Sequence, residues 1–249
     1  MVKEYPRNPY LDHVDSRRFE IADYWLNVDK AAHKPFMIVN FTDNKLPWND
    51  TGGHGKRLLE DMRLSNPTGK VSDDATMRLA VEQFNKQDYQ GAADTFADLR
   101  MTYPDSEHQF NAQMLELQSL LGSYRGSSYS SLPLTDAEKR IKQIVRQFPN
   151  DASQHQQDLN QTFAKIRFLR AERVWDNAEY RRKKQENDSA RFYYQKILEE
   201  FSDTPFAEQA NVRLEELQGA PDNPPQYFKP LVFLFNADND DRPWLKDKN

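Results

Sequence analysis

The sequence contains no cysteine among its 249 residues. Disulfides, thiolate zinc sites and cysteine nucleophiles are therefore excluded. Glycine is also scarce, with 8 residues, which is low for the glycine-rich loops of nucleotide-binding folds and suits helices, whose interiors glycine destabilises. No apolar run approaches the about 18 residues that a membrane-spanning helix needs, so we expect no membrane span in this chain.

The charged residues are nearly balanced in sign. The 34 Lys and Arg residues and the 39 Asp and Glu residues give a formal net charge of −5. A dedicated nucleic-acid binder usually carries a basic surface, so we expect no nucleic-acid partner. Only 37% of the residues are hydrophobic, yet 12% are aromatic, and the mean hydropathy is −0.94. This composition favours large side chains buried in several thin interfaces over one thick core.

One pattern recurs four times along the chain. A small residue is followed by large apolar residues at +4 and +7, by an anchor at +11 and usually by proline at +12. Offsets of this kind fall on one face of an α-helix, so the pattern predicts the packing face of a repeated helix. A degenerate copy is Gly55, Leu59, Met62, Asn66 and Pro67. The predicted repeat-packing residues of the three clear copies are Ala92, Phe96, Leu99, Tyr103 and Pro104; Ala137, Ile141, Ile144, Phe148 and Pro149; and Ala190, Tyr194, Ile197 and Phe201.

Each clear copy is followed by a second amphipathic stretch, at residues 107–121, 152–180 and 205–217. The intervening proline ends the first helix, because proline cannot continue a helix interior. Successive proline positions, the last of which is occupied by Ser202, are 37, 45 and 53 residues apart, against about 34 in tetratricopeptide repeats. We therefore predict an all-α fold, a tetratricopeptide-like right-handed α-solenoid of helix-turn-helix repeats. Stacked repeats of this kind leave a concave groove, which we expect to bind a protein or peptide partner.

The positions of the repeats divide the chain into four segments. Residues 1–26 are interpreted as a truncated first repeat, because Tyr5-Pro6 matches Tyr103-Pro104 and residues 10–26 form a second helix whose partner helix would lie upstream of Met1. Residues 27–54 form an insert loop without periodicity, with a candidate short strand at 35–41. Residues 55–218 carry the tetratricopeptide-like repeats, and residues 219–249 form a Pro-rich extended C-terminal tail.

The search for chemistry finds no catalytic constellation. The glycine-rich stretch GGHGK at 52–56 is followed by Arg57, whereas a phosphate loop needs Ser or Thr after its lysine, so we interpret it as a flexible loop before a helix. No two histidines lie three or four residues apart, as a helical metal pair requires. We expect His108 and His155, beside repeat turns, to be solvent-facing or locally capped. The sequence thus predicts no catalytic residue, no metal site, no cofactor and no enzymatic activity.

Candidate partner-binding residues come from three places: a basic stretch between Arg167 and Lys184, the aromatic residue Tyr193 within the repeats, and an apolar cluster in the C-terminal tail. The basic stretch could dock an acidic partner or lipid headgroups, but interspersed glutamates also fit a solvated, self-neutralised helix end. Tyr193 could face a groove beside the packing residue Tyr194. The apolar cluster at 231–235 could either cover a neighbouring repeat or dock a partner. The candidates are Arg170, Arg173, Arg181, Arg182, Tyr193, Leu231, Phe233 and Phe235.

Three segments carry a family resemblance, one of which is SYRGSSYSSLPLTDAEKRIKQIVRQFPND (123–151). DYQGAADTFADLRMTYPDSE (88–107) and DSARFYYQKILEEFSDTPFAEQANVRLEEL (188–217) resemble the BamD-type outer-membrane assembly lipoproteins, and the resemblance covers roughly residues 1–26 and 55–218. It implies a non-catalytic scaffold of the cell envelope that assists outer-membrane protein assembly, with other assembly subunits as partners. It also implies a periplasmic, outer-membrane-associated location if an export signal lies upstream. A Tol–Pal-type periplasmic coordinator and a cytosolic tetratricopeptide co-chaperone adaptor remain open as alternatives.

Overall fold

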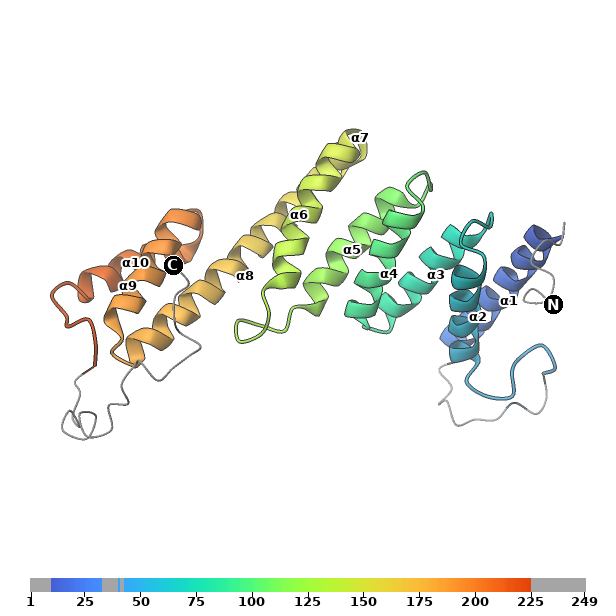
Figure 1. Ribbon diagram of the computed structural model, residues 1–249, viewed down its shortest axis with the longest axis horizontal. Helices are drawn as coiled ribbons and strands as arrows, with labels where there is room; N and C mark the ends of the chain where they lie inside the picture. The colour runs from blue at the N-terminus through green and yellow to red at the C-terminus, as the bar shows by residue number, and fades with distance from the viewer. Residues whose placement is uncertain (1–9, 33–39, 41–42, 225–249) are drawn as a thin grey trace, which may run out of the picture. The chain divides into compact units, whose positions relative to one another are not determined.

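All regular structure in the described part of the chain is α-helical, which confirms the predicted all-α, tetratricopeptide-like fold. The computed structural model describes residues 10–32, 40 and 43–224. The chain is divided into two compact units, residues 1–170 and residues 171–249. The helices are α1 (Leu11–Ala32), α2 (Thr51–Ser65), α3 (Ser72–Asn85), α4 (Tyr89–Thr102), α5 (Gln109–Ser123), α6 (Leu132–Gln147), α7 (Pro149–Gln154), α8 (Gln156–Lys183), α9 (Asn187–Glu200) and α10 (Pro205–Glu216) (Figure 1).

In the first unit, each helix from α1 to α7 packs against the next helix along the chain (Figure 1). The buried apolar side chains form separate clusters between successive helices. Leu26 and Leu59 belong to the cluster of α1 to α3, Phe96 to that of α3 to α5, and Leu117 and Ile144 to that of α5 to α8. Several thin interfaces therefore take the place of one thick core in this unit, as the composition indicates.

The second unit has its own cluster. Ala178 of α8, Tyr194 and Ile197 of α9 and Ala210 of α10 are each 0% exposed within it. The Trp175 ring lies with its centroid 5.4 Å from that of Tyr194. An aromatic pair at this separation adds packing energy to the area that it buries, so Tyr194 is a central anchor of the unit.

Local sequence explains how the repeat helices begin and end. The Asp88 carboxylate accepts a hydrogen bond from the Gly91 backbone N–H at 3.2 Å and caps α4. Asp50 does the same for α2, accepting from the Gly53 N–H at 3.0 Å. An aspartate at this position satisfies one of the backbone N–H groups that a helix start leaves without a partner. α4 ends just before Tyr103-Pro104, in agreement with the proline rule.

The GGHGK stretch lies within the first turns of α2, not in a loop before the helix as its composition had indicated. Helix packing explains the glycine at its fourth position. A Cβ atom on Gly55 would lie 2.9 Å from Leu26 Cγ and 3.2 Å from the backbone oxygen of Ala22, both in α1. The missing side chain thus lets α1 and α2 come close together.

Other helix bounds also differ from those expected. α1 continues past residue 26 to Ala32 and packs against α2, so helical turns occupy both ends of segment 27–54. The stretch 152–180 is divided at His155 into α7 and α8, and Pro149 starts α7 as well as ending α6. The candidate strand at 35–41 falls outside the described residues apart from Asn40, which is in no strand. Among the described helices, none has the length and apolarity needed to cross a bilayer.

Candidate partner-binding site

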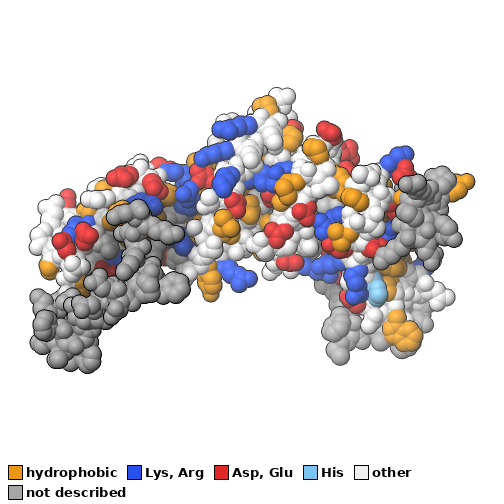
Figure 2. All heavy atoms as spheres, in the orientation of Figure 1, with side chains coloured by type: hydrophobic (Ala, Val, Ile, Leu, Met, Phe, Trp, Pro, Cys, Tyr) orange, Lys and Arg blue, Asp and Glu red, His pale blue; other side chains and the backbone are white. Residues whose placement is uncertain are grey.

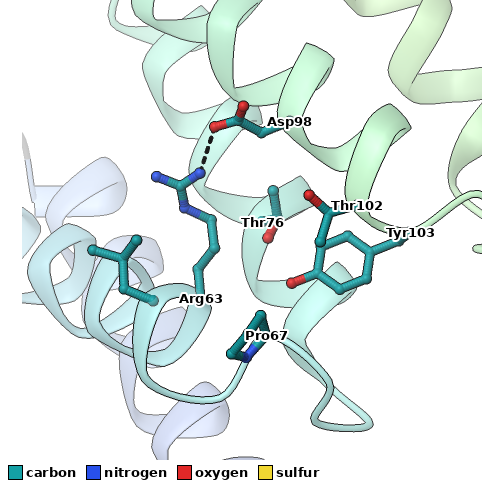
Figure 3. Close-up of a pocket in the computed structure, with 7 residues that line it drawn as sticks. Arg63, Pro67, Thr76, Asp98, Thr102 and Tyr103 are labelled. Atoms are coloured by element: carbon teal, nitrogen blue, oxygen red, sulfur yellow. Dashed lines mark hydrogen bonds and ion pairs between the residues drawn. The ribbon is translucent and has the colours of Figure 1, made fainter.

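A cavity of about 290 Å³ opens between α2, α3 and the C-terminal end of α4. Polar and apolar side chains share its wall, and Leu64 at its edge is 67% exposed. The close-up shows the side chains of three successive helices and the intervening turn converging on one space (Figure 3). The residues that line it are Arg63, Leu64, Pro67, Thr76, Asp98, Thr102 and Tyr103.

Arg63 is held in the cavity wall by two carboxylates. It donates hydrogen bonds of 2.6 Å to Asp98 of α4 and to Glu60 of its own helix. Burial lowers the pKa of Arg63, but the hydrogen bonds and charges of Glu60 and Asp98 outweigh it, so the pKa stays above its ordinary value. The guanidinium is therefore a fixed cation, and its buried Nε has no hydrogen-bond partner among the described residues.

Tyr103 supplies a second polar group without a partner. Its hydroxyl is buried and makes no hydrogen bond of good geometry to any described residue, although the Thr76 and Ser72 hydroxyls lie close enough to lower its pKa in part. It points into the cavity between Thr76 and Pro67 (Figure 3). Burial raises the pKa of the Tyr103 hydroxyl, so the group stays protonated and keeps a proton to donate. A cavity with two unpaired donors is suited to a ligand that brings an acceptor oxygen, because leaving such donors buried and unpaired is costly.

Replacing Tyr103 by phenylalanine is expected to leave the free energy of unfolding unchanged or to raise it slightly. The substitution removes a buried hydroxyl that has no partner and keeps the ring. Tyr103→Asp should instead lower stability, since it places an unpaired charge at the same anchor. Urea unfolding of both variants checks this, and a clear loss of stability in Tyr103→Phe would show that the hydroxyl has a partner in solution.

The structure buries most of the predicted repeat-packing residues. Tyr103 and Phe148 are half-buried at the helix ends, while Pro104 is exposed in a turn and Pro149 is exposed at the start of α7. The remaining positions of the three clear copies lie in the apolar clusters and are no more than 6% exposed: Ala92, Phe96, Leu99, Ala137, Ile141, Ile144, Ala190, Tyr194, Ile197 and Phe201.

Three of the four candidate partner-binding arginines pair with glutamates. Arg170 pairs with Glu138 of α6. Arg181 donates a hydrogen bond to Glu186 and Arg182 donates one to Glu179, and these bonds raise the pKa values of both guanidinium groups. Figure 2 likewise shows Lys and Arg side chains mixed with Asp and Glu side chains over the visible face. This arrangement favours a self-neutralised helix end over a basic docking patch.

The remaining candidates do not meet at one place. Arg173 and Tyr193 are half-buried, and Tyr193 packs beside the apolar cluster of the second unit. Leu231, Phe233 and Phe235 lie outside the described residues. Tyr103 and Pro67 are the two cavity residues that belong to the repeat pattern. The others gave no sequence signal, because Arg63 and Asp98 stand 35 residues apart and belong to different repeats.

The successive helix pairs define a tetratricopeptide-like helical repeat protein. Comparison with protein families finds one that matches: the model of the family YfiO, described as outer membrane lipoprotein, matches residues 53–220, which is well over half of the chain. The chain belongs to this family of outer membrane lipoproteins. None of the curated proteins compared with the chain matches it. The matched segment includes every residue that lines the cavity.

Proposed function

We propose that the chain is a non-catalytic protein–protein interaction scaffold of the cell envelope, of BamD type, which assists outer-membrane protein assembly. The observation that carries this proposal is the match of the outer membrane lipoprotein family over residues 53–220. The repeat architecture supports it, because stacked helix pairs build extended surfaces for protein partners. A fold alone does not identify the partner, so the kind of partner has to be inferred from the chemistry of the cavity.

The cavity between α2, α3 and α4 is proposed as one contact point for that partner. It offers a fixed guanidinium and a protonated tyrosine hydroxyl beside the exposed apolar side chain of Leu64. Tyrosine and arginine are enriched at the centres of protein interfaces. The matching occupant is a peptide segment that places a carbonyl or carboxylate oxygen on Tyr103 and Arg63 and an apolar side chain on Leu64.

Site-specific photo-crosslinking in the host cell tests this assignment. A photoreactive residue at position 64 samples the cavity, and one at Val212 of α10, which is 51% exposed, is the matched control on the second unit. We expect position 64 to capture outer-membrane assembly subunits or their unfolded substrates, and position 212 to capture them much less. Capture of Tol–Pal components, or of a cytosolic chaperone tail, would replace the proposal by one of those two functions.

Cell fractionation tests the location independently. The proposal expects the mature protein in the outer-membrane fraction, with a lipid-modified N-terminus detected by mass spectrometry. A non-acylated form confined to the soluble periplasm would favour a coordinator of Tol–Pal type. A form confined to the cytosol would leave only the co-chaperone alternative.

A further inference from the structure

Three potential metal ligands from distant parts of the chain meet beside the α4–α5 turn. Asp74 lies in the first turn of α3, Glu107 lies in the turn, and His108 is the N-cap residue of α5. One ligand atom from each lies within 4.8 Å of the others. The His108 Nε2 atom is 2.7 Å from Asp74 Oδ1, although the two residues are 34 positions apart in the sequence.

We propose that Asp74, Glu107 and His108 bind one divalent transition-metal ion of the zinc type. An imidazole nitrogen with two carboxylates is a ligand set that such ions accept, while magnesium and calcium prefer oxygen ligands alone. The three side chains leave the remaining coordination positions to water. The ion joins α3 to the α4–α5 turn and has a structural role.

The local charge favours a cation. Two carboxylates face a single imidazole, and among the described residues neither Asp74 nor Glu107 is paired with a lysine or arginine. The only polar partner of Asp74 in the described chain is His108, and Glu107 has none. Metal binding requires the ionised carboxylate and the neutral imidazole. A divalent ion would therefore compensate charge that the protein itself leaves uncompensated.

The geometry needs only a small adjustment. Zinc ligands lie about 2.0–2.2 Å from the ion, so two donors in tetrahedral geometry stand about 3.2–3.6 Å apart. His108 Nε2 and Asp74 Oδ1 are 2.7 Å apart, so the ion would replace their hydrogen bond and these two atoms would have to move apart. Glu107 is exposed and can move toward the ion. Ser106 ties the backbone at His108 to α3. Its Oγ donates a 2.7 Å hydrogen bond to Asp73 of α3 and accepts one of 3.2 Å from the His108 N–H.

The site is mechanically connected to the cavity. Tyr103 lines the cavity and stands at the beginning of the same turn, and Gln109, next to His108, donates to the Tyr103 backbone oxygen at 2.6 Å. An ion on Asp74, Glu107 and His108 would hold this turn against α3. Metal binding should then raise the melting temperature and reduce motion of the cavity wall.

Titration of the full chain with zinc chloride tests the proposal. Isothermal titration calorimetry, with metal analysis after dialysis, should show one zinc per chain, and zinc should raise the melting temperature. His108→Gln and Glu107→Gln should each weaken binding about tenfold or more, since even loss of an outer-shell partner costs metal sites that much. Magnesium chloride should not substitute for zinc.

His155→Gln is the matched control. His155 Nδ1 lies 3.8 Å from Asp158 Oδ2, and no third ligand joins this histidine–aspartate pair among the residues that the structure describes. We expect this variant to bind zinc as the unaltered chain does. The proposal is overturned if about 100 µM zinc changes neither heat nor melting temperature, if Glu107→Gln and His108→Gln bind zinc unchanged, or if His155→Gln abolishes binding. Glu107 is exposed, so Glu107→Gln should fold normally. Its zinc affinity therefore tests the proposal even if His108→Gln folds poorly.

Discussion

Glu116→Lys is expected to lower the free energy of unfolding by about 3–5 kcal/mol, the usual cost of leaving buried charges without their counterion. Glu116 of α5 is 3% exposed and lies between arginines of the two neighbouring helices. Its carboxylate accepts a 2.7 Å hydrogen bond from Arg140 Nη2 of α6 and a 3.3 Å hydrogen bond from Arg100 Nε of α4. Lysine at this position would bring three cations together away from water, with no anion between them.

Urea unfolding followed by circular dichroism measures this loss. Asp136→Asn is the matched control, because Asp136 is 41% exposed and its ion pair in the described chain is the i,i+3 pair with Lys139 on α6. It touches the Glu116 cluster only through the charge that it exerts on Arg140. Exposed pairs of this kind contribute about 0–1 kcal/mol. A loss in Glu116→Lys no larger than that of the control would show that water reaches the Glu116 cluster and that α4, α5 and α6 pack less closely than the structure has them.

The neutral variant Glu116→Gln separates charge from packing. Burial raises the pKa of Glu116 above its ordinary value despite the two arginines. The folded chain therefore holds this proton more tightly than the unfolded chain, and the stability that Glu116 contributes falls as the pH rises from below its unfolded pKa through its folded pKa. The stability of Glu116→Gln relative to the unaltered chain should accordingly improve between pH 4 and pH 7, and a change in the opposite direction would contradict the raised pKa.

The repeat register was the most predictable part of this fold. Residues such as Phe96 and Ile144 recur on one helix face at fixed offsets, and a local 3.6-residue period is legible in a single sequence. α3 was not predicted as a helix. Its buried positions include Ala75, Thr76 and Ala80, small or polar side chains that give a weak apolar stripe, so packing against α2 and α4 defines this helix more than its own pattern does.

The candidate site could not be read from the sequence for a different reason. Arg63 and Asp98 meet across 35 residues, and His108 and Asp74 across 34. Each residue alone is an ordinary charged or polar position on a helix or turn. Only the stacking of successive repeats brings them together, and the varying repeat length, with its inserts, hides which positions will face one another.

The basic residues near the end of α8 predicted a docking surface that the structure does not favour. Arg181 and Arg182 stand out in the sequence, but Glu179 and Glu186 lie within hydrogen-bonding reach of them in the structure. Carboxylates three to five residues away on a helix and its following turn are the simplest partners for an arginine. A count of basic residues therefore predicts a docking surface only when the arginines and lysines that have such local partners are left out of the count.

Tyr194→Ala is expected to lower the free energy of unfolding by about 3–5 kcal/mol, as for other buried aromatic side chains replaced by alanine. Tyr194 is 0% exposed, and its ring packs with Trp175. Its hydroxyl donates a 2.6 Å hydrogen bond to Glu179 Oε1. Tyr194→Phe, which keeps the ring, should lose only about 1 kcal/mol, since it removes one hydrogen bond while Arg182 and Arg213 still pair with Glu179.

Phe192→Ala is the control for Tyr194, because Phe192 lies on the same helix α9, is also aromatic and is 61% exposed. Surface substitutions of this kind usually change stability by less than about 0.5 kcal/mol. Urea unfolding of the two alanine variants thus tests the repeat register directly, since the positions differ by only two residues. Equal losses would mean that α9 is rotated about its axis relative to the packing face that the repeat pattern and the structure assign to it, and a larger loss for Phe192→Ala would place Phe192 in a protein interface rather than in solvent.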